Sequence, residues 1–247
     1  MGKIGMKFMD PDAFSIRLPR SLLSIPALGK LTVDTGRVTA EALAMSRYGW
    51  YVDLKMGVSK SGKFKAHVDG EREADAEALM VEHFGRRADS IRSELIAAYP
   101  ARRAIFDAAF DAHANGQYLL SIPVFFAQVD GICTDVLRLV FFQRTGREKV
   151  IADLKGRAGS ELAQAYLAPL DTDMPATMSL SSRGRGVSGL NRHTVLHGES
   201  VDYGTRENSL RAISLLNYIS QSLRRELPEI EQGAATTDAP PADSAAS

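Results

Sequence analysis

Cysteine is almost absent from this sequence, since Cys133 is the only one in 247 residues. A single thiol cannot form an intramolecular disulfide and cannot supply a cysteine-rich zinc module. Net charge is absent too, because 30 Lys and Arg residues balance 30 Asp and Glu residues, so no global field attracts nucleic acid or an anionic membrane. The first residues lack the apolar core and cleavage site of a secretory signal. We therefore expect a cytoplasmic protein in which any RNA contact comes from a local basic patch.

Long apolar runs without charge are also missing. The most apolar segment, residues 118–142, is long enough to span a membrane, but it contains Asp130, Asp135 and Arg138. Three ionisable side chains would be costly in hydrocarbon. We expect a buried helix, or two helical segments that meet near Gly131, and no membrane contact.

The overall composition, with 45% hydrophobic and 24% charged residues, is typical of a globular protein with a buried core. Apolar residues recur at helical spacing, with Ser160 and Thr205 as N-caps and Pro169 as a terminator. These patterns predict an all-α fold, a helical bundle over residues 69–230. The expected helices are 71–99, 101–116, 118–142, 159–168 and 205–227. In the last of them the expected buried stripe is Leu210, Ile213, Leu216 and Leu223.

The two ends of the chain differ from this helical domain. Residues 1–68 mix proline, glycine and short apolar runs, which predicts an irregular region with a short N-terminal β-hairpin and a short helix capped by Thr39. Residues 55–70 are basic and rich in glycine and serine, so we expect a solvated loop or flexible hairpin there. Residues 231–247 contain no large apolar side chain, which predicts a disordered tail.

Several isolated residues invite a functional interpretation. Tyr48 and Trp50, the only tryptophan, lie close together in the sequence and could stack on a base. We expect this aromatic pair to cover the helical core instead. His67 and His83 are expected to be solvated.

The most informative segment is LNRHTVLHGESVDYGT, residues 190–205. On a helix, successive side chains turn by about 100°, so His193 and His197 project from the same face. Arg192 and His197, five positions apart, point about 140° away from each other on this spacing. A second copy of the helix across a twofold axis would bring an arginine and a histidine from different chains together.

Metal-dependent and nucleophilic chemistries have little support in this segment. A metal site would use His193 and His197 with Glu199 or Asp202 as a third ligand, but HTVLH lacks the glutamate of the metalloprotease motif. We therefore expect no metal. No nearby serine lies in a G-x-S-x-G turn, and RGRGVSG lacks the lysine and Ser/Thr of a Walker A loop.

Metal-free cleavage of a phosphodiester needs two kinds of group that the segment does contain. A histidine can move the proton of a ribose 2′-hydroxyl near neutral pH, and an arginine fork matches phosphate oxygens. This chemistry predicts His197 as general acid/base, Arg192 as the cation and His193 as an assisting residue. Three further arginines are predicted to bind the substrate: Arg183, Arg185 and Arg206.

A purely structural role for the same segment is the main alternative to catalysis. Asn191 would cap the short helix, and His193 would donate to a nearby carbonyl group. Arg192 would pair with Glu199 or Asp202. The motif would then serve packing alone.

Gln128 and Asp130 are polar residues in an otherwise apolar helix, so they need hydrogen-bond partners. In one interpretation they bond a facing helix or the turn at Gly131. In the other, Asp130 stands behind His197 and orients its imidazole. We favour the first interpretation.

Arg192, four intervening residues and His197, with His193 directly after the arginine, resemble the R-x4–6-H motif of the HEPN superfamily. The context is similar as well. Residues 123–132 match a P-x-x-x-x-Q-x-D/E-G-I helix that bacterial HEPN-like proteins, most of them uncharacterised, pair with an R-H-x-x-x-H-G motif and a following amphipathic helix. The resemblance covers about residues 71–227.

The resemblance implies an all-α, HEPN-like helical bundle that dimerises and cleaves RNA without metal or cofactor. Arg192 and His197 would line a composite site between two chains, with His193 beside them. The implied partners are an RNA substrate, a second copy of the chain, and an antitoxin or phage-defence protein. Because the family also contains non-catalytic members, the alternative is a helical dimer that binds a protein partner or a nucleotide.

Overall fold

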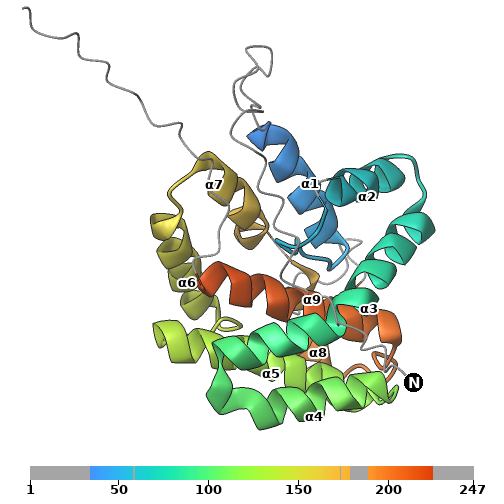
Figure 1. Cartoon of the computed structure of the whole chain (residues 1–247), viewed down its shortest axis with the longest axis vertical. Helices are drawn as coiled ribbons and strands as arrows, with labels where there is room; N and C mark the ends of the chain where they lie inside the picture. The colour runs from blue at the N-terminus through green and yellow to red at the C-terminus, as the bar shows by residue number, and fades with distance from the viewer. Residues whose placement is uncertain (1–33, 58, 173, 179–188, 225–247) are drawn as a thin grey trace, which may run out of the picture. The chain divides into compact units, whose positions relative to one another are not determined.

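The computed structural model of this chain describes residues 34–57, 59–172, 174–178 and 189–224. Within these ranges every regular element is a helix and none is a strand (Figure 1). The all-α fold class is therefore confirmed. The predicted N-terminal β-hairpin and the predicted C-terminal tail lie outside the described residues.

The described part of the chain contains nine α-helices and three short 3-10 turns. The helices are α1 (Thr35–Arg47), α2 (Lys60–Asp69), α3 (Glu73–Ala98), α4 (Arg103–Ala114), α5 (Tyr118–Leu137), α6 (Arg144–Arg157), α7 (Glu161–Leu167), α8 (Arg192–Leu196) and α9 (Arg206–Leu223). The 3-10 turns are η3 (Pro100–Arg102), η4 (Ala168–Asp171) and η5 (Pro175–Thr177). Ser160 and Thr205 cap α7 and α9 as predicted, because their side chains accept the N–H groups of Ala163 and Asn208.

The predicted short helix near Thr39 is present but starts earlier than expected, and a second helix forms where the sequence predicts a loop. Helix α1 begins at Thr35, and the side chain of Asp34 caps it by accepting the N–H of Arg37 at 3.0 Å, so the predicted cap Thr39 is wrong. Helix α2 occupies most of the predicted loop 55–70. Its one buried side chain, Phe64, packs edge-on against a neighbouring tyrosine ring. One apolar anchor therefore holds a helix whose own sequence favours a loop, since tertiary packing supplies most helix stability.

Helix α9 lies at the centre of the helical arrangement, packed against α3 and α5 (Figure 1). Every residue from Ser209 to Leu223 except Arg211 is buried, which is far more than the predicted stripe of four. The serines of α9 tolerate burial because each has a hydrogen-bond partner. Ser209 bonds His113 and Ser121, and Ser220 bonds Tyr99. Within the helix, the hydroxyl of Ser214 donates to the carbonyl of Arg211 at 2.9 Å, and that of Ser222 donates to the carbonyl of Tyr218 at 2.8 Å.

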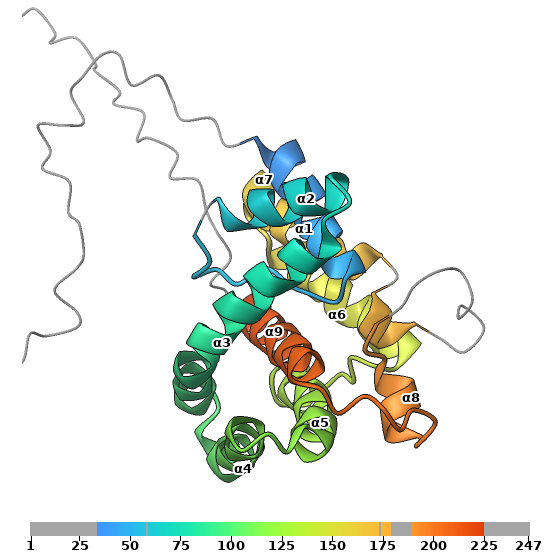
Figure 2. The same ribbon diagram turned by 90° about the vertical axis from the view of Figure 1, so that its right-hand side faces the viewer.

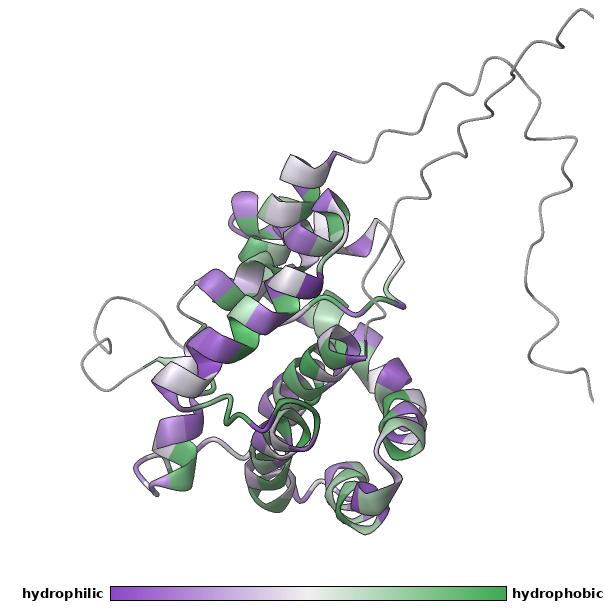
Figure 3. Ribbon diagram, turned by 90° about the vertical axis from the view of Figure 1, so that its left-hand side faces the viewer, coloured by the Kyte–Doolittle hydropathy of each residue, from purple (hydrophilic) through white to green (hydrophobic). Residues whose placement is uncertain are grey.

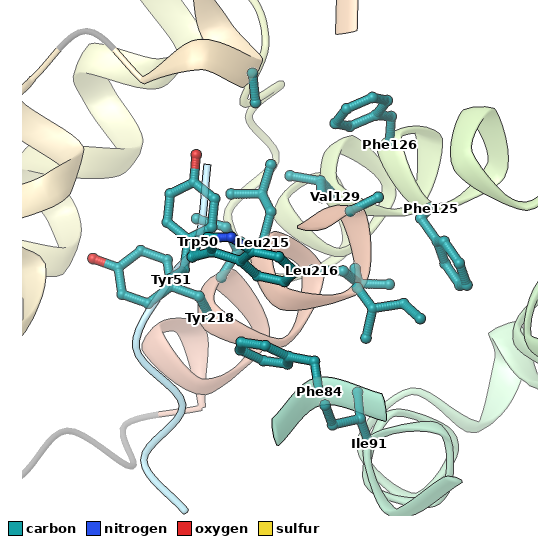
Figure 4. Packing of buried hydrophobic residues seen from close by; sticks show 14 of the residues in the cluster. Trp50, Tyr51, Phe84, Ile91, Phe125, Phe126, Val129, Leu215, Leu216 and Tyr218 are labelled. Carbon is teal, nitrogen blue, oxygen red and sulfur yellow. The ribbon is translucent and has the colours of Figure 1, made fainter. Parts of the chain in front are cut away.

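Trp50 is part of the core and not a surface platform for a base. Its side chain is fully buried, its ring stacks on Phe84 at 5.6 Å between centroids, and its indole N–H donates to Glu77 at 3.0 Å (Figure 4). Tyr51 and Tyr218 stack beside it at 5.5 Å. Around this core, hydrophilic and hydrophobic residues alternate along the outer helices, as expected of helices with one buried face (Figure 3).

Helix α5 is long and apolar enough to cross a membrane by length and composition alone, and 44% of its most apolar window is buried. It packs against α4 and α9, as the core helix of a soluble protein does. Its polar residue Gln128 is buried and accepts a hydrogen bond from Arg102.

Gly146, buried in the first turn of α6, gives a direct test of how this helix packs. A Cβ at this position would overlap the carbonyl oxygen of Val140, a backbone atom that cannot rotate away. Gly146→Ala should therefore lower the free energy of unfolding by about 1–3 kcal/mol. Gly156 lies in the same helix with no atom within 4 Å of an added Cβ, so Gly156→Ala should raise it by up to about 1 kcal/mol. Urea denaturation measures both, and a Gly146→Ala protein as stable as the wild type would contradict this packing.

Candidate functional site

Helix α8, five residues long, is built around the side chain of Asn191. The Oδ1 atom of Asn191 accepts the N–H groups of His193 at 2.9 Å and Thr194 at 3.2 Å, which confirms the predicted cap. Its Nδ2 donates to the carbonyls of Pro175 at 2.8 Å and Met178 at 2.9 Å. One amide side chain therefore starts α8 and fixes it to the η5 segment.

Arg192, the first residue of α8, is directed toward α5, beside which α8 lies (Figure 2). Its guanidinium covers the ring of Phe142 at 5.3 Å, and its Nη2 lies 3.7 Å from Oδ2 of Asp130. Asp130 is thus the ion-pair partner, in place of the predicted Glu199 or Asp202. The Nε atom of Arg192 is buried and has no hydrogen-bond partner among the residues that the structure describes.

Asp130 and Gln128 bond neighbouring segments of the fold, which was the first of their two interpretations. Oε1 of Gln128 accepts from Nη1 of Arg102, in the facing η3 turn, at 2.8 Å. Oδ1 of Asp130 accepts the N–H of Phe142 at 2.9 Å, in the loop after α5. Burial raises the pKa of Asp130, and the amide of Phe142 and the charge of Arg192 offset only part of this rise. Asp130 therefore positions Arg192 and not His197.

His193 and His197 lie on one face of α8, as their spacing predicts. Their ring centroids are 4.1 Å apart and the rings are tilted by 47°. Nε2 of His193 lies 3.6 Å from Oε1 of Glu199, whereas His197 is exposed at the C-terminal end of the helix. Gly198 adopts a φ of +73° and turns the chain away after it.

A cavity of about 670 Å³ opens between α6, η4, η5 and α8. Its charged wall residues are Arg144, Arg147, Arg192, Glu148 and Asp171, and the imidazole of His193 also lines it. Apolar side chains, including Phe142, Ile151 and Leu170, form much of the remaining wall. This combination of convergent cations and apolar surface suits an anionic organic ligand.

The predicted substrate-binding arginines do not all reach this cavity. Arg206 is exposed at the start of α9, where its guanidinium covers Gly85 of α3. Burial is the largest cause of the lowered pKa of His113. The charge of Arg206 lowers this pKa further, and the charge of Asp89 raises it. Arg183 and Arg185 lie outside the described residues.

Arg144 and Arg147 line the cavity but were not singled out in the sequence, and α6, which carries them, was not among the expected helices. A signal for them does exist. Both stand in the first turn of α6, which contains no acidic residue. Basic residues are disfavoured at this positive end of a helix, and Glu148 offsets only Arg144, so the position of Arg147 favours a role in the cavity.

His193 and His197 gain no third metal ligand here: among the described residues, no group of three or more His, Cys, Asp or Glu side chains is arranged to hold an ion. No family model matches the chain, and neither a curated protein nor a solved structure matches it.

Proposed function

We propose that the α8 site cleaves RNA without a metal ion, as an endoribonuclease of HEPN type. The observation that carries the proposal is the grouping of Arg192 and His193 on the wall of a cation-lined cavity, with the ring of His197 4.1 Å from that of His193. These are the two kinds of group that transesterification at a phosphodiester requires. In a cell, the protein would act in the cytoplasm as a toxin or a phage-defence effector.

The proposed reaction is an attack of the ribose 2′-oxygen on the adjacent phosphorus. His197 takes the proton of the 2′-hydroxyl, and the bond between the 2′-oxygen and phosphorus forms. The bond between phosphorus and the 5′-oxygen breaks, and His193, in its protonated form, supplies the proton to that oxygen. Arg192 stabilises the charge on the phosphate oxygens. The products are a 2′,3′-cyclic phosphate and a 5′-hydroxyl end.

The proposal includes a homodimer, because a separation of five positions on a helix turns Arg192 and His197 about 140° apart within one chain. Exposed apolar side chains near α8 support a protein–protein contact there. They are Leu119 (53% exposed), Leu120 (62%), Leu196 (38%) and Val201 (87%). The hydroxyl of Tyr203 donates to the carbonyl of Leu119 at 3.0 Å, which holds the segment after α8 against the start of α5. A second copy of the chain on this surface would place its own motif close to the cavity.

The same exposed residues also favour the alternative, a non-catalytic helical dimer that binds a protein partner such as an antitoxin, or a nucleotide. In that case Arg192 serves packing through its contacts with Phe142 and Asp130. The motif would then be needed for stability and not for cleavage.

Wild-type protein purified in EDTA should cut a mixed RNA pool and leave 2′,3′-cyclic phosphate ends. Chelation should not slow the reaction, because the proposed groups are all side chains of this chain. End-group analysis by mass spectrometry checks the products. A dimer that leaves RNA intact would support the alternative, and activity that EDTA abolishes, with stoichiometric zinc in the protein, would indicate a metal-dependent hydrolase.

A further inference from the structure

Arg147 is a cation in the cavity wall with most of its hydrogen-bonding capacity unused. It is half-buried, and its one hydrogen bond within the described chain runs from Nη1 to the carbonyl of Thr177 at 3.5 Å. An arginine has five N–H donors. A guanidinium that is partly withdrawn from water and so weakly bonded is a ready ligand for an anion.

The carboxylates on the cavity wall do not neutralise Arg147. Glu148 pairs with Arg144 at 3.3 Å, and Asp171 pairs with Lys155 at 2.5 Å. In the described part of the chain no ion pair involves Arg147. Arg192 lies 3.7 Å from the carboxylate of Asp130. The uncompensated positive charge of the cavity is therefore concentrated at Arg147.

The first turn of α6 adds to this charge. Gln143 provides no side-chain cap, and the turn holds two arginines and no acidic residue. The amide groups of a helix N-terminus carry a partial positive charge, which leaves Arg147 unfavourably placed, since Glu148 offsets only Arg144. Both the first turn of α6 and the cavity therefore favour a bound phosphate.

We propose that this cavity binds the nucleotide next to the scissile phosphodiester, with Arg147 as the ligand of its phosphate. The volume of about 670 Å³ lies within the usual range of about 300–1,000 Å³ for sites of organic ligands. Phe142 and Ile151 supply apolar wall for the base or the sugar. The identification of the ligand as RNA rests on the proposed function, whereas nucleotide binding can be tested without cleavage.

Calorimetric titration of the full-length protein with 5′-AMP and with adenosine tests the phosphate contact. Wild-type protein should bind 5′-AMP more tightly than adenosine. Arg147→Ala should weaken 5′-AMP binding at least about tenfold, the loss expected for a hydrogen bond to a charged group. It should leave adenosine binding unchanged. Lys149→Ala, which removes the same charge from an exposed position on α6 outside the cavity, should bind both ligands as the wild type does.

Two results would overturn the inference: a wild-type protein that does not bind 5′-AMP, or an Arg147→Ala protein that binds it as tightly as the wild type. Equal weakening by Lys149→Ala would overturn it as well, since binding would then depend on net charge alone. Thermal midpoints of the three proteins exclude unfolding as the cause.

Steady-state cleavage of RNA separates this inference from the proposed function. Arg147→Ala should raise KM for RNA with little change in kcat, because the contact lies beside the reacting phosphate. If RNA is cleaved with an unchanged KM, the subsite assignment is wrong and the nuclease stands. If 5′-AMP binding depends on Arg147 but the wild type cleaves no RNA, the nucleotide site stands and the nuclease proposal fails.

Discussion

His197→Ala should lower the rate of RNA cleavage by about 10²–10⁴-fold, the usual contribution of a general acid or base. His197 is exposed at the end of α8, and its one ring contact within the described residues is with His193, so its removal should leave the protein folded. Single-turnover cleavage rates and thermal midpoints, measured on the same preparations, distinguish a chemical defect from a folding defect. His67→Ala removes a half-buried histidine of α2, outside the site, and as the control it should cleave at the wild-type rate.

Arg192→Ala should also abolish cleavage, but it is a less specific test. Its side chain packs on Phe142 and pairs with Asp130, so alanine leaves a partly buried carboxylate without its cation. Arg192→Lys keeps the charge and removes the fork, and it should retain more stability than activity. If His197→Ala protein cleaves RNA as fast as the wild type, the catalytic assignment is wrong.

Mixed dimers show whether the site is composite. A dimer of one Arg192→Ala chain and one His197→Ala chain contains one intact pair if Arg192 and His197 act across the interface. It contains none if both act within one chain. Mixing two inactive variants should therefore restore part of the activity, and a mixture that stays inactive while exchanging subunits would contradict the composite site.

Local patterns were enough to predict the all-α class and several helix ends. Ser160, Asn191 and Thr205 cap helices as expected, because a capping side chain and its N–H partners lie within a few residues of one another. The shared face of His193 and His197 follows from helix geometry in the same way. Each of these features depends on sequence separations of less than about one helical turn.

The burial of polar residues could not be predicted, because their partners are distant in the sequence. His83 was expected to be solvated, but it is buried against Asp53, 30 residues earlier. Gln221 is buried in α9 for the same reason, since its side chain bonds Asp53 and the N–H of Leu54. A hydropathy pattern assigns such residues to the surface. Only the fold supplies the hydrogen-bond partners that offset the desolvation cost of burying them.

The cavity, too, is formed by residues that are distant from one another in the sequence. Arg192 and His193 are adjacent in the sequence and could be identified from it, whereas Arg147 reaches the same cavity from a helix about 45 residues earlier, a separation that no motif spans. The candidate catalytic groups were thus accessible to sequence reasoning, and the shape of the ligand site was not.

Asp53→Ala should lower the free energy of unfolding by about 3–5 kcal/mol, the cost of breaking a buried charge pair by removing one partner. Asp53 is 1% exposed and accepts three side-chain hydrogen bonds. The donors are Nε2 of His83 at 3.2 Å, Nε of Arg87 at 2.9 Å and Nε2 of Gln221 at 2.9 Å. Nζ of Lys60, a donor, lies 3.4 Å from Nδ1 of His83, which is consistent with the proton of that imidazole being on Nε2. One carboxylate therefore connects the segment before α2 with α3 and α9.

Urea denaturation at several pH values tests both the size and the cause of this effect. Burial alone would raise the pKa of Asp53, but the hydrogen bonds from His83, Arg87 and Gln221 outweigh it and hold the pKa well below its usual value. The stabilisation is therefore complete above the unfolded-state pKa of about 3.9 and is lost as the pH falls below it. The difference between wild type and Asp53→Ala should be constant from about pH 7 to pH 5 and shrink below about pH 4.

Asp69→Ala is the matched control for Asp53→Ala. Asp69 pairs with Lys65 at 2.5 Å on the exposed face of α2, where its side chain is 59% exposed. Solvent screens such a pair, so its loss should cost less than about 1 kcal/mol. If Asp53→Ala were no more destabilising than Asp69→Ala, Asp53 would not be the buried junction of α3 and α9. The burial of His83 and Gln221 would then need another explanation.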